Sequence, residues 1–256
     1  MIHPTDPWFP HAGPGADDAE ALVICFPFAG GGAAFYRPWI EAARAKGLAL
    51  LAVELPGRGR RQGEPLLRQA GAMAEALGPA LRRRLDRPFL LFGHSLGALL
   101  AFETARHLRR RYALLPDALI VSGRHAPDEA RDPASHRHAL ALPALAEELA
   151  GLNGTAPEVL AHPELLPVIA PMLQADFAMT ELHRHRDEAP LDCPLLALAG
   201  SDDPEVAPGE ITRWRRHAAG SFRQVTLPGD HFFLRDHRDR ILDEWCAALT
   251  PDRAAA

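Results

Sequence analysis

A serine stands between two glycines in the segment Gly93–Gly97 (GHSLG), which matches the pattern G-x-S-x-G. An apolar run, Pro88–Phe92, comes directly before the segment, and a helical pattern of apolar residues begins directly after it. In that setting the serine sits on a tight turn between a strand and a helix, which presents its hydroxyl at the edge of a sheet. The segment therefore predicts a nucleophile at Ser95, and a purely structural turn is the alternative.

A serine hydroxyl is a poor nucleophile until a base takes its proton, so this hypothesis requires a histidine. Nucleophiles on such turns have their acid next along the chain and their histidine last. His231 lies in a late loop after a strand-like segment, and Asp202 and Asp203 follow an apolar run. Carboxyl ends of parallel strands share one edge of a sheet, so we expect these side chains near Ser95. Asp203 is the preferred acid, and Asp202 stays as the alternative.

An acyl-transfer intermediate also carries a negative oxygen, which two hydrogen-bond donors must stabilise. One donor is expected from the backbone N–H of Leu96, the residue after the serine. The other should come from a loop after an early strand, and the glycine-rich segment Cys25–Trp39 is such a loop. Phe28 is the preferred donor there and Ala29 the alternative. A phosphate-binding loop is excluded, because no Lys-Ser or Lys-Thr pair follows the glycines.

The other histidines receive no chemical role from the sequence. His136 and His138 lie in a polar, charged segment, and we expect them at the surface without a metal ion. His183 forms an H-x-x-x-D pattern with Asp187, which also occurs in acyltransferases, but the flanking residues of that motif are lacking. We therefore expect His183 and His185 to mark a solvated helix end.

The composition is that of a globular protein and excludes several classes. The chain has 256 residues, of which 47% are hydrophobic and 24% charged, with a net charge of -5. This charge argues against a nucleic-acid-binding protein. The three cysteines are far apart and form no C-x-x-C pair, which suggests neither a zinc site nor a disulfide framework. The chain shows no signal pattern and no apolar run of about 18 residues, so we expect a cytoplasmic protein without a membrane segment.

Short apolar runs alternate with longer helical patterns along the chain. The runs are continuously apolar, as in strands that helices cover on both faces. This alternation predicts an α/β fold with a mostly parallel, doubly wound sheet in a single domain, residues 1–256. The predicted buried strands are Ala21–Phe26, Leu48–Leu55, Pro88–Phe92, Ala118–Ser122 and Pro194–Ala199, and the more polar Phe222–Leu227 is strand-like. The predicted helices are Tyr36–Ala45, Gln69–Leu85, Gly97–Arg110, Pro208–His217 and Arg238–Leu249.

The region of about residues 128–186 breaks this alternation, because it contains helical patterns and no convincing strand. The patterns cover Leu142–Leu152, Pro157–Leu160 and Glu164–Leu182. Their apolar residues need a surface to cover. Two interpretations remain open: extra helices that extend the core, or a lid over a site at the carboxyl edge of the sheet.

Five segments occur in a fixed order along the chain: FPFAGGGAAFYRPW, LPGRGRR, GHSLGALLAFE, AGSDDPEV and LPGDHFFL. Together they resemble the type II thioesterases, discrete α/β-hydrolases that accompany non-ribosomal peptide and polyketide synthases. The insertion resembles the lid of that family, with its Gly-Thr, Pro-Glu-Val-Leu and Ala-Asp-Phe elements. The resemblance runs from about Trp8 to Trp245. It departs at the lid end, TELHRHRDE, where family members often have an aromatic residue.

The resemblance implies an α/β-hydrolase fold with a helical lid insertion of about residues 128–186. It also implies hydrolysis of acyl or aminoacyl thioesters from the phosphopantetheine arm of carrier proteins, which removes misprimed or stalled units. Five residues receive roles from the family motifs: Ser95 as nucleophile, His231 as general base, Asp203, three residues after Gly200, as acid, and the backbone N–H groups of Phe28 and Leu96 as the oxyanion hole.

No metal or organic cofactor is expected, because the phosphopantetheine arrives as part of the substrate. The expected partner is an acyl or peptidyl carrier protein domain, bound by a monomer. Such domains are generally acidic, so arginines could dock them. The candidates are Arg58, Arg60 and Arg61, Arg82–Arg84 and Arg109–Arg111, each with a solvated helix end or loop as the alternative. Two other functions remain open: a free-standing carboxylesterase for small esters, and a non-catalytic α/β-hydrolase-like scaffold.

Overall fold

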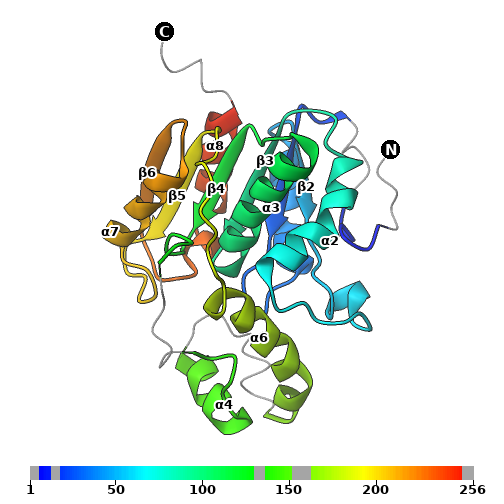
Figure 1. Ribbon diagram of the computed structural model, residues 1–256, viewed down its shortest axis with the longest axis vertical. Coiled ribbons are helices and arrows are strands. Elements are labelled where there is room, and N and C mark those ends of the chain that lie inside the picture. Colours follow the sequence, from blue (N-terminus) through cyan, green and yellow to red (C-terminus); the bar gives the residue numbers. More distant parts are fainter. Residues whose placement is uncertain (1–5, 13–17, 130–135, 152–162, 250–256) are drawn as a thin grey trace.

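A single parallel sheet forms the centre of the protein (Figure 1). The structure is a computed structural model that describes residues 6–12, 18–129, 136–151 and 163–249. Within these ranges the sheet has six strands in the order β2-β1-β3-β4-β5-β6, and each neighbouring pair is parallel. The strands are β1 (Ala21–Phe26), β2 (Leu48–Ala52), β3 (Phe89–His94), β4 (Ala118–Ser122), β5 (Leu195–Gly200) and β6 (Phe222–Leu227).

Helices cover both faces of the sheet, which confirms the predicted α/β class. Successive side chains of a strand point to opposite faces, so β1 contributes to two cores. Leu22 and Ile24 belong to the core under α2 and α3, whereas Val23 and Cys25 belong to the core under α1 and α8. The α-helices are α1 (Ile40–Arg44), α2 (Ala70–Arg82), α3 (Leu96–Tyr112), α4 (Leu142–Gly151), α6 (Leu166–Glu181), α7 (Pro208–Ile211) and α8 (Arg238–Leu249).

The predicted boundaries differ from the observed ones where proline or a change of backbone partner intervenes. The helix expected at Tyr36–Ala45 begins as the 3-10 helix η2 (Ala33–Trp39), which contains Pro38, and only then becomes α1. The strand expected to reach Leu55 ends at Ala52, and the Glu54 N–H donates to the carbonyl of Trp8 instead. Four further 3-10 helices occur in the described residues: η3 (Gly59–Arg61), η5 (Pro163–Leu165), η6 (Thr212–His217) and η7 (Phe233–Arg235).

The insertion between β4 and β5 places α4 and α6 beyond one end of the sheet (Figure 1). These two helices pack on each other and form an apolar cluster of their own, which includes Leu145, Leu149, Leu173 and Phe177. The partly buried Ala29, from the loop after β1, packs against the same cluster. The insertion therefore covers a loop at the sheet edge with its own cluster, while Met179 of α6 also joins the main core under α2 and α3. The helix predicted at Pro157–Leu160 lies outside the described residues.

The three cysteines are free thiols, two of them buried, and burial raises the pKa of the Cys193 thiol to about 12. None of the helices in the ranges described above is long and apolar enough to span a lipid bilayer.

Candidate active site

Ser95 occupies a strained turn between β3 and α3. Its backbone angles are φ 55° and ψ −117°, a region that residues other than glycine rarely adopt. Both neighbouring glycines are required for close backbone approach. A Cβ on Gly93 would lie 1.9 Å from the carbonyl oxygen of Gly97, and a Cβ on Gly97 would lie 2.3 Å from that of Phe26. The two glycines of the G-x-S-x-G pattern thus allow β1, β3 and the first turn of α3 to pack closely around the serine.

His231 and Asp203 lie in hydrogen-bond contact at the same edge of the sheet. His231 Nδ1 is 2.8 Å from Asp203 Oδ2, with the histidine in the loop after β6 and the aspartate in the loop after β5. The other carboxylate oxygen, Oδ1, accepts the backbone N–H groups of Glu205 at 2.8 Å and Val206 at 3.2 Å. The Asp203 side chain is buried, so these donors hold its carboxylate in one orientation.

Asp202 does not contact His231. Its carboxylate is exposed and accepts the hydroxyl of Ser201 at 2.7 Å, while its backbone N–H donates to the carbonyl of Gly229. Of the two consecutive aspartates, only Asp203 is turned toward the histidine. The backbone of Asp202 instead joins the loop after β5 to the loop after β6 through its hydrogen bond to Gly229.

The loop after β1 carries the backbone donors expected for an oxyanion. Gly31 N–H donates to the carbonyl of Phe28 at 2.9 Å, which closes a turn with Ala29 and Gly30 at its centre. The N–H groups of Phe28 and Leu96 donate to no acceptor within the residues that the structure describes. Leu96 is the first residue of α3. A backbone N–H at this position has no acceptor within the helix and lies at the positive end of the helix dipole. Both amides are available to a ligand.

A buried ion pair ties this loop to the insertion. Arg58 contacts both carboxylate oxygens of Asp176, on α6, with N–O distances of 2.8 Å and 2.6 Å. Arg58 also donates to the carbonyl of Gly31 at 2.8 Å, and Asp176 accepts the N–H of Gly30 at 2.8 Å. Leu173 of α6 lies against Gly30 as well. The sequence pattern did not reveal this connection, because its members come from three distant segments.

A cavity of about 290 Å³ lies between the sheet edge and the insertion. Phe28, Ser95 and His231 line it from the sheet side. Its lid side is apolar and consists of Leu149, Ile169, Met172, Leu173 and Phe177. A ligand bound here therefore contacts the serine at one side and an apolar surface at the other.

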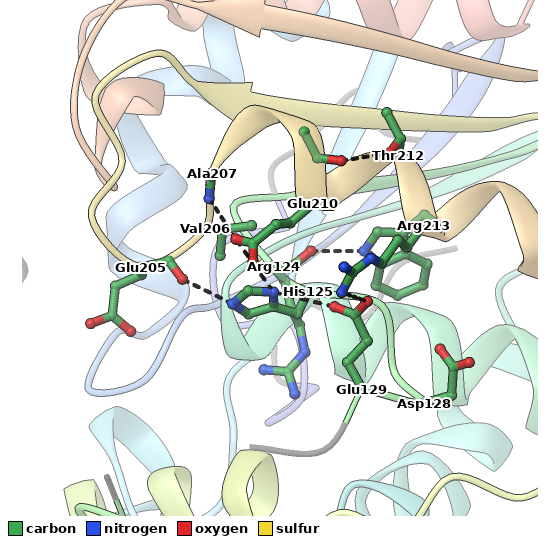
Figure 2. Close-up of polar contacts among 12 residues, drawn as sticks. Arg124, His125, Asp128, Glu129, Glu205, Val206, Ala207, Glu210, Thr212 and Arg213 are labelled. Atoms are coloured by element: carbon green, nitrogen blue, oxygen red, sulfur yellow. Dashed lines mark hydrogen bonds and ion pairs between the residues drawn. The ribbon is translucent and has the colours of Figure 1, made fainter. Parts of the chain in front are cut away.

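Another part of the wall is polar and comes from the segment after β4, whose contacts Figure 2 shows. His125 Nε2 donates to the carbonyl of Glu205 at 2.9 Å, and its Nδ1 lies 3.3 Å from Glu129. Trp214 Nε1–H donates to the carbonyl of Arg124 at 2.8 Å. The Arg124 side chain extends away from these contacts in Figure 2 and lines the cavity. Contacts to η6 and the β5 loop thus hold this polar wall in place.

His94, next to the serine, is buried beneath the His231 loop. Its Nδ1 lies 3.0 Å from Ser122 Oγ on β4, and its ring centre is 4.9 Å from that of His231. Burial, and then the charge of His231, lowers the pKa of His94 well below its ordinary value. His94 is therefore a packing residue under the site, with its side chain turned to Ser122.

His183 lies at the cavity and not at a solvated helix end, so that prediction was wrong for this residue. Its side chain is only 10% exposed, and it lines the cavity wall beside Arg124. Burial, with the charge of Arg124 next, lowers the pKa of His183 from 6.5 to about 4. The sequence could not show that His183 is buried. The residues around it are polar, and such a segment can either pack against the rest of the protein or lie in solvent.

The depressed pKa makes His183 a source of acid sensitivity. The unfolded chain binds a proton near pH 6.5 and the folded chain only near pH 4, so stability falls as the pH drops between these values. At pH 4.5 the loss from this residue should be about 2–3 kcal/mol relative to pH 7.5. Urea unfolding of wild type and His183→Gln at both pH values measures it. An equal pH dependence in the two proteins would contradict the assignment.

The basic residues expected to dock a carrier protein are mostly engaged internally. Arg58 and Arg61 are buried, the first with Asp176 and the second with Glu64, so the docking prediction is wrong for both. Of the three arginines in that segment, Arg60 is the exposed one. Ion pairs also engage Arg84 with Asp6, and Arg109 and Arg110 with Glu188.

A serine on a strand–helix turn, with an aspartate and a histidine in the loops after later strands, defines the α/β-hydrolase class. Solved structures bear this out for the fold. The type II thioesterase BorB from the borrelidin biosynthetic cluster superposes with a TM-score of 0.84 at 40% identity, covering 97% of this chain and 100% of BorB. The RedJ thioesterase from the prodiginine pathway of Streptomyces coelicolor gives 0.84 at 38% identity, covering 94% and 98%.

The chain belongs to the thioesterase family, because the family model for the thioesterase domain matches residues 21–249. A relative in Brevibacillus parabrevis, described as the linear gramicidin dehydrogenase LgrE, is 39% identical over 228 residues, which are 88% of this chain and 86% of that protein. Membership in this family places the chain among the thioester hydrolases and confirms the resemblance seen in the sequence.

Proposed function

We propose that this protein is an editing type II thioesterase. It hydrolyses acyl or aminoacyl thioesters from the phosphopantetheine arm of carrier proteins and so clears misprimed or stalled units of a polyketide or non-ribosomal peptide synthase. The relatives BorB and RedJ, described as thioesterases of such pathways, support this proposal. The observation that carries it is the contact of His231 with Asp203 at the rim of the cavity that Ser95 lines.

In the first half-reaction, Ser95 Oγ attacks the thioester carbonyl while His231 Nε2 takes its proton. Asp203 accepts Nδ1–H of His231, holds the ring in the tautomer that exposes Nε2, and stabilises the imidazolium that forms. The negative oxygen of the tetrahedral intermediate accepts the N–H groups of Phe28 and Leu96. Each such donor contributes about 3–4 kcal/mol to the transition state.

The intermediate then collapses and the C–S bond breaks. The proton on His231 passes to the pantetheine sulfur, so the carrier leaves as the free thiol and the acyl group stays on Ser95 as an ester. Water attacks this ester with His231 again as base, and collapse returns the proton to Ser95 and releases the acid. The atoms balance as one thioester and one water giving one acid and one thiol.

No step of this sequence needs a metal or an organic cofactor from the protein. The phosphopantetheine belongs to the substrate, and the carrier protein domain is the partner that brings it. A dehydrogenase activity, which the description of LgrE names, would require a dinucleotide site, and the sequence has no G-x-G-x-x-G motif after a strand. Action as a monomer and a cytoplasmic location stay predictions.

The experiment that tests the function compares two substrates. Acetyl-phosphopantetheinyl carrier protein is incubated with the purified enzyme and its intact mass is followed, and p-nitrophenyl acetate is assayed in parallel. We expect loss of the acetyl mass, with a kcat/KM on the carrier well above that on the ester. Activity on the ester alone would replace the proposal with a free-standing esterase, and inactivity on both would favour a scaffold.

The two aspartates provide a matched pair of variants. Asp203→Asn should lower kcat by about 10⁴-fold, because the amide no longer holds the required tautomer of His231. Asp202→Asn removes an exposed carboxylate from the neighbouring position and should leave kcat within about twofold. Steady-state kinetics on the carrier thioester measures both. A large loss with Asp202→Asn and none with Asp203→Asn would reverse the assignment.

A further inference from the structure

Two histidines and a glutamate that the proposed reaction does not use meet at the wall of the cavity. One ring nitrogen of His136, one of His138 and one carboxylate oxygen of Glu181 lie within 4.8 Å of one another. His136 and Glu181 also line the cavity. Two imidazoles and a carboxylate form a donor set that zinc and similar divalent ions bind in proteins.

The charge at this point favours a cation. The Glu181 side chain is 2% exposed, and within the described residues its one ion-pair partner is His138, whose Nδ1 lies 2.8 Å from Oε2. Next to it, Arg137 shares its guanidinium between Glu148 and Glu205, at 2.6 Å and 2.7 Å. Within the described residues, Glu181 therefore has a histidine and no arginine or lysine as its ion-pair partner. A buried carboxylate is costly unless a positive charge compensates it.

His136 adds a donor without a partner. Its Nε2 atom is buried and has no hydrogen bond, although buried polar atoms nearly always have one. The centres of the His136 and His138 rings are 5.3 Å apart. Backbone N–H groups of Arg137 and His138 donate to the Glu181 carboxylate, at 2.8 Å and 2.9 Å, and hold this segment against the end of α6. The three side chains are therefore already placed together.

We propose that His136, His138 and Glu181 bind a divalent transition-metal ion of the zinc class. The ion replaces the proton between His138 Nδ1 and Glu181. Zinc–ligand bonds of about 2.0–2.2 Å bring ligand atoms to about 3.3 Å from one another, so small rotations of the side chains complete the set. Three protein ligands leave a fourth position for water. Because two of the ligands line the cavity, the bound ion lies at its wall.

Binding is tested on full-length protein without an affinity tag, after dialysis against a chelator. Zinc chloride is titrated by calorimetry, and cobalt(II) is added to a second sample to detect the visible absorption of a tetrahedral site. We expect one ion per chain, with an affinity that rises with pH because the imidazoles must lose their protons. His136→Ala, His138→Ala and Glu181→Gln should each weaken zinc binding at least about tenfold.

Two further variants keep the test decisive. His237→Ala removes a histidine whose Nε2 contacts the carbonyl of Pro228, outside the cluster, and should bind zinc like wild type. His231→Ala should also retain binding; if it loses zinc while His136→Ala keeps it, the ion sits at the proposed catalytic residues and the proposal fails. Absence of both binding heat and cobalt absorption overturns it as well. If Glu181→Gln does not fold, zinc binding by His136→Ala decides the test, because His136 is partly exposed and its replacement should leave the fold intact.

Discussion

Replacing Ser95 with alanine should lower kcat on an acyl-carrier thioester on the order of 10⁶-fold, because in the proposed mechanism the Ser95 hydroxyl forms the acyl-enzyme. The fold should persist, since the backbone contacts of the turn do not involve the hydroxyl. The Ser95 N–H donates to the carbonyl of Ser122, and its carbonyl accepts from Ala98. Intact-mass kinetics on the carrier, with circular dichroism as the check on folding, measures this. Residual activity within tenfold of wild type would exclude Ser95 as the nucleophile.

Ser95→Gly separates the chemistry from the strain at the same position. Glycine adopts φ 55° without the steric cost that serine bears, so this variant should be as inactive as Ser95→Ala. Its free energy of unfolding should exceed that of Ser95→Ala by about 1 kcal/mol. Urea unfolding of the two variants side by side gives the difference. A less stable glycine variant would mean that the turn stores no strain.

Replacing Asp176 with alanine should destabilise the protein by about 3–5 kcal/mol, because it leaves the buried Arg58 guanidinium without its counter-charge. The N–H of Gly30 loses its acceptor at the same time, so the loop that carries the Phe28 amide is released from α6. Urea unfolding at neutral pH measures the loss. A change of less than about 1 kcal/mol would show that Arg58 finds water or another partner.

A double variant distinguishes stability from positioning. Arg58→Met with Asp176→Leu replaces the ion pair by apolar side chains of similar size, which commonly restores stability. The contacts to the Gly30 N–H and the Gly31 carbonyl remain lost, so the Phe28 amide, the proposed oxyanion donor, should stay misplaced. We expect near-wild-type unfolding with kcat still lowered about 10²-fold and KM little changed. Full recovery of kcat would mean that the pair only stabilises the fold.

The local chemistry of the chain determined the fold class and the strand–helix turn at Ser95. Continuous apolar runs predicted buried parallel strands, and the sheet contains all of them with ends shifted by a few residues. The G-x-S-x-G segment predicted a strand–serine–helix turn because only glycine permits the approaches seen at Gly93 and Gly97. Both inferences depend on residues that are close in sequence, where periodicity and steric limits act directly.

Tertiary structure alone decided which distant residues meet. Asp202 and Asp203 are equivalent in the sequence, and the turn after β5 directs only the second toward His231. The sequence predicted Arg58 to be a docking residue, but it is buried in an ion pair with Asp176, 118 residues further along the chain. His138 and Glu181 are 43 residues apart and came together only through the packing of the insertion. Such pairings follow from the path of the whole chain, because a polar side chain carries no local signal of the partner it will find.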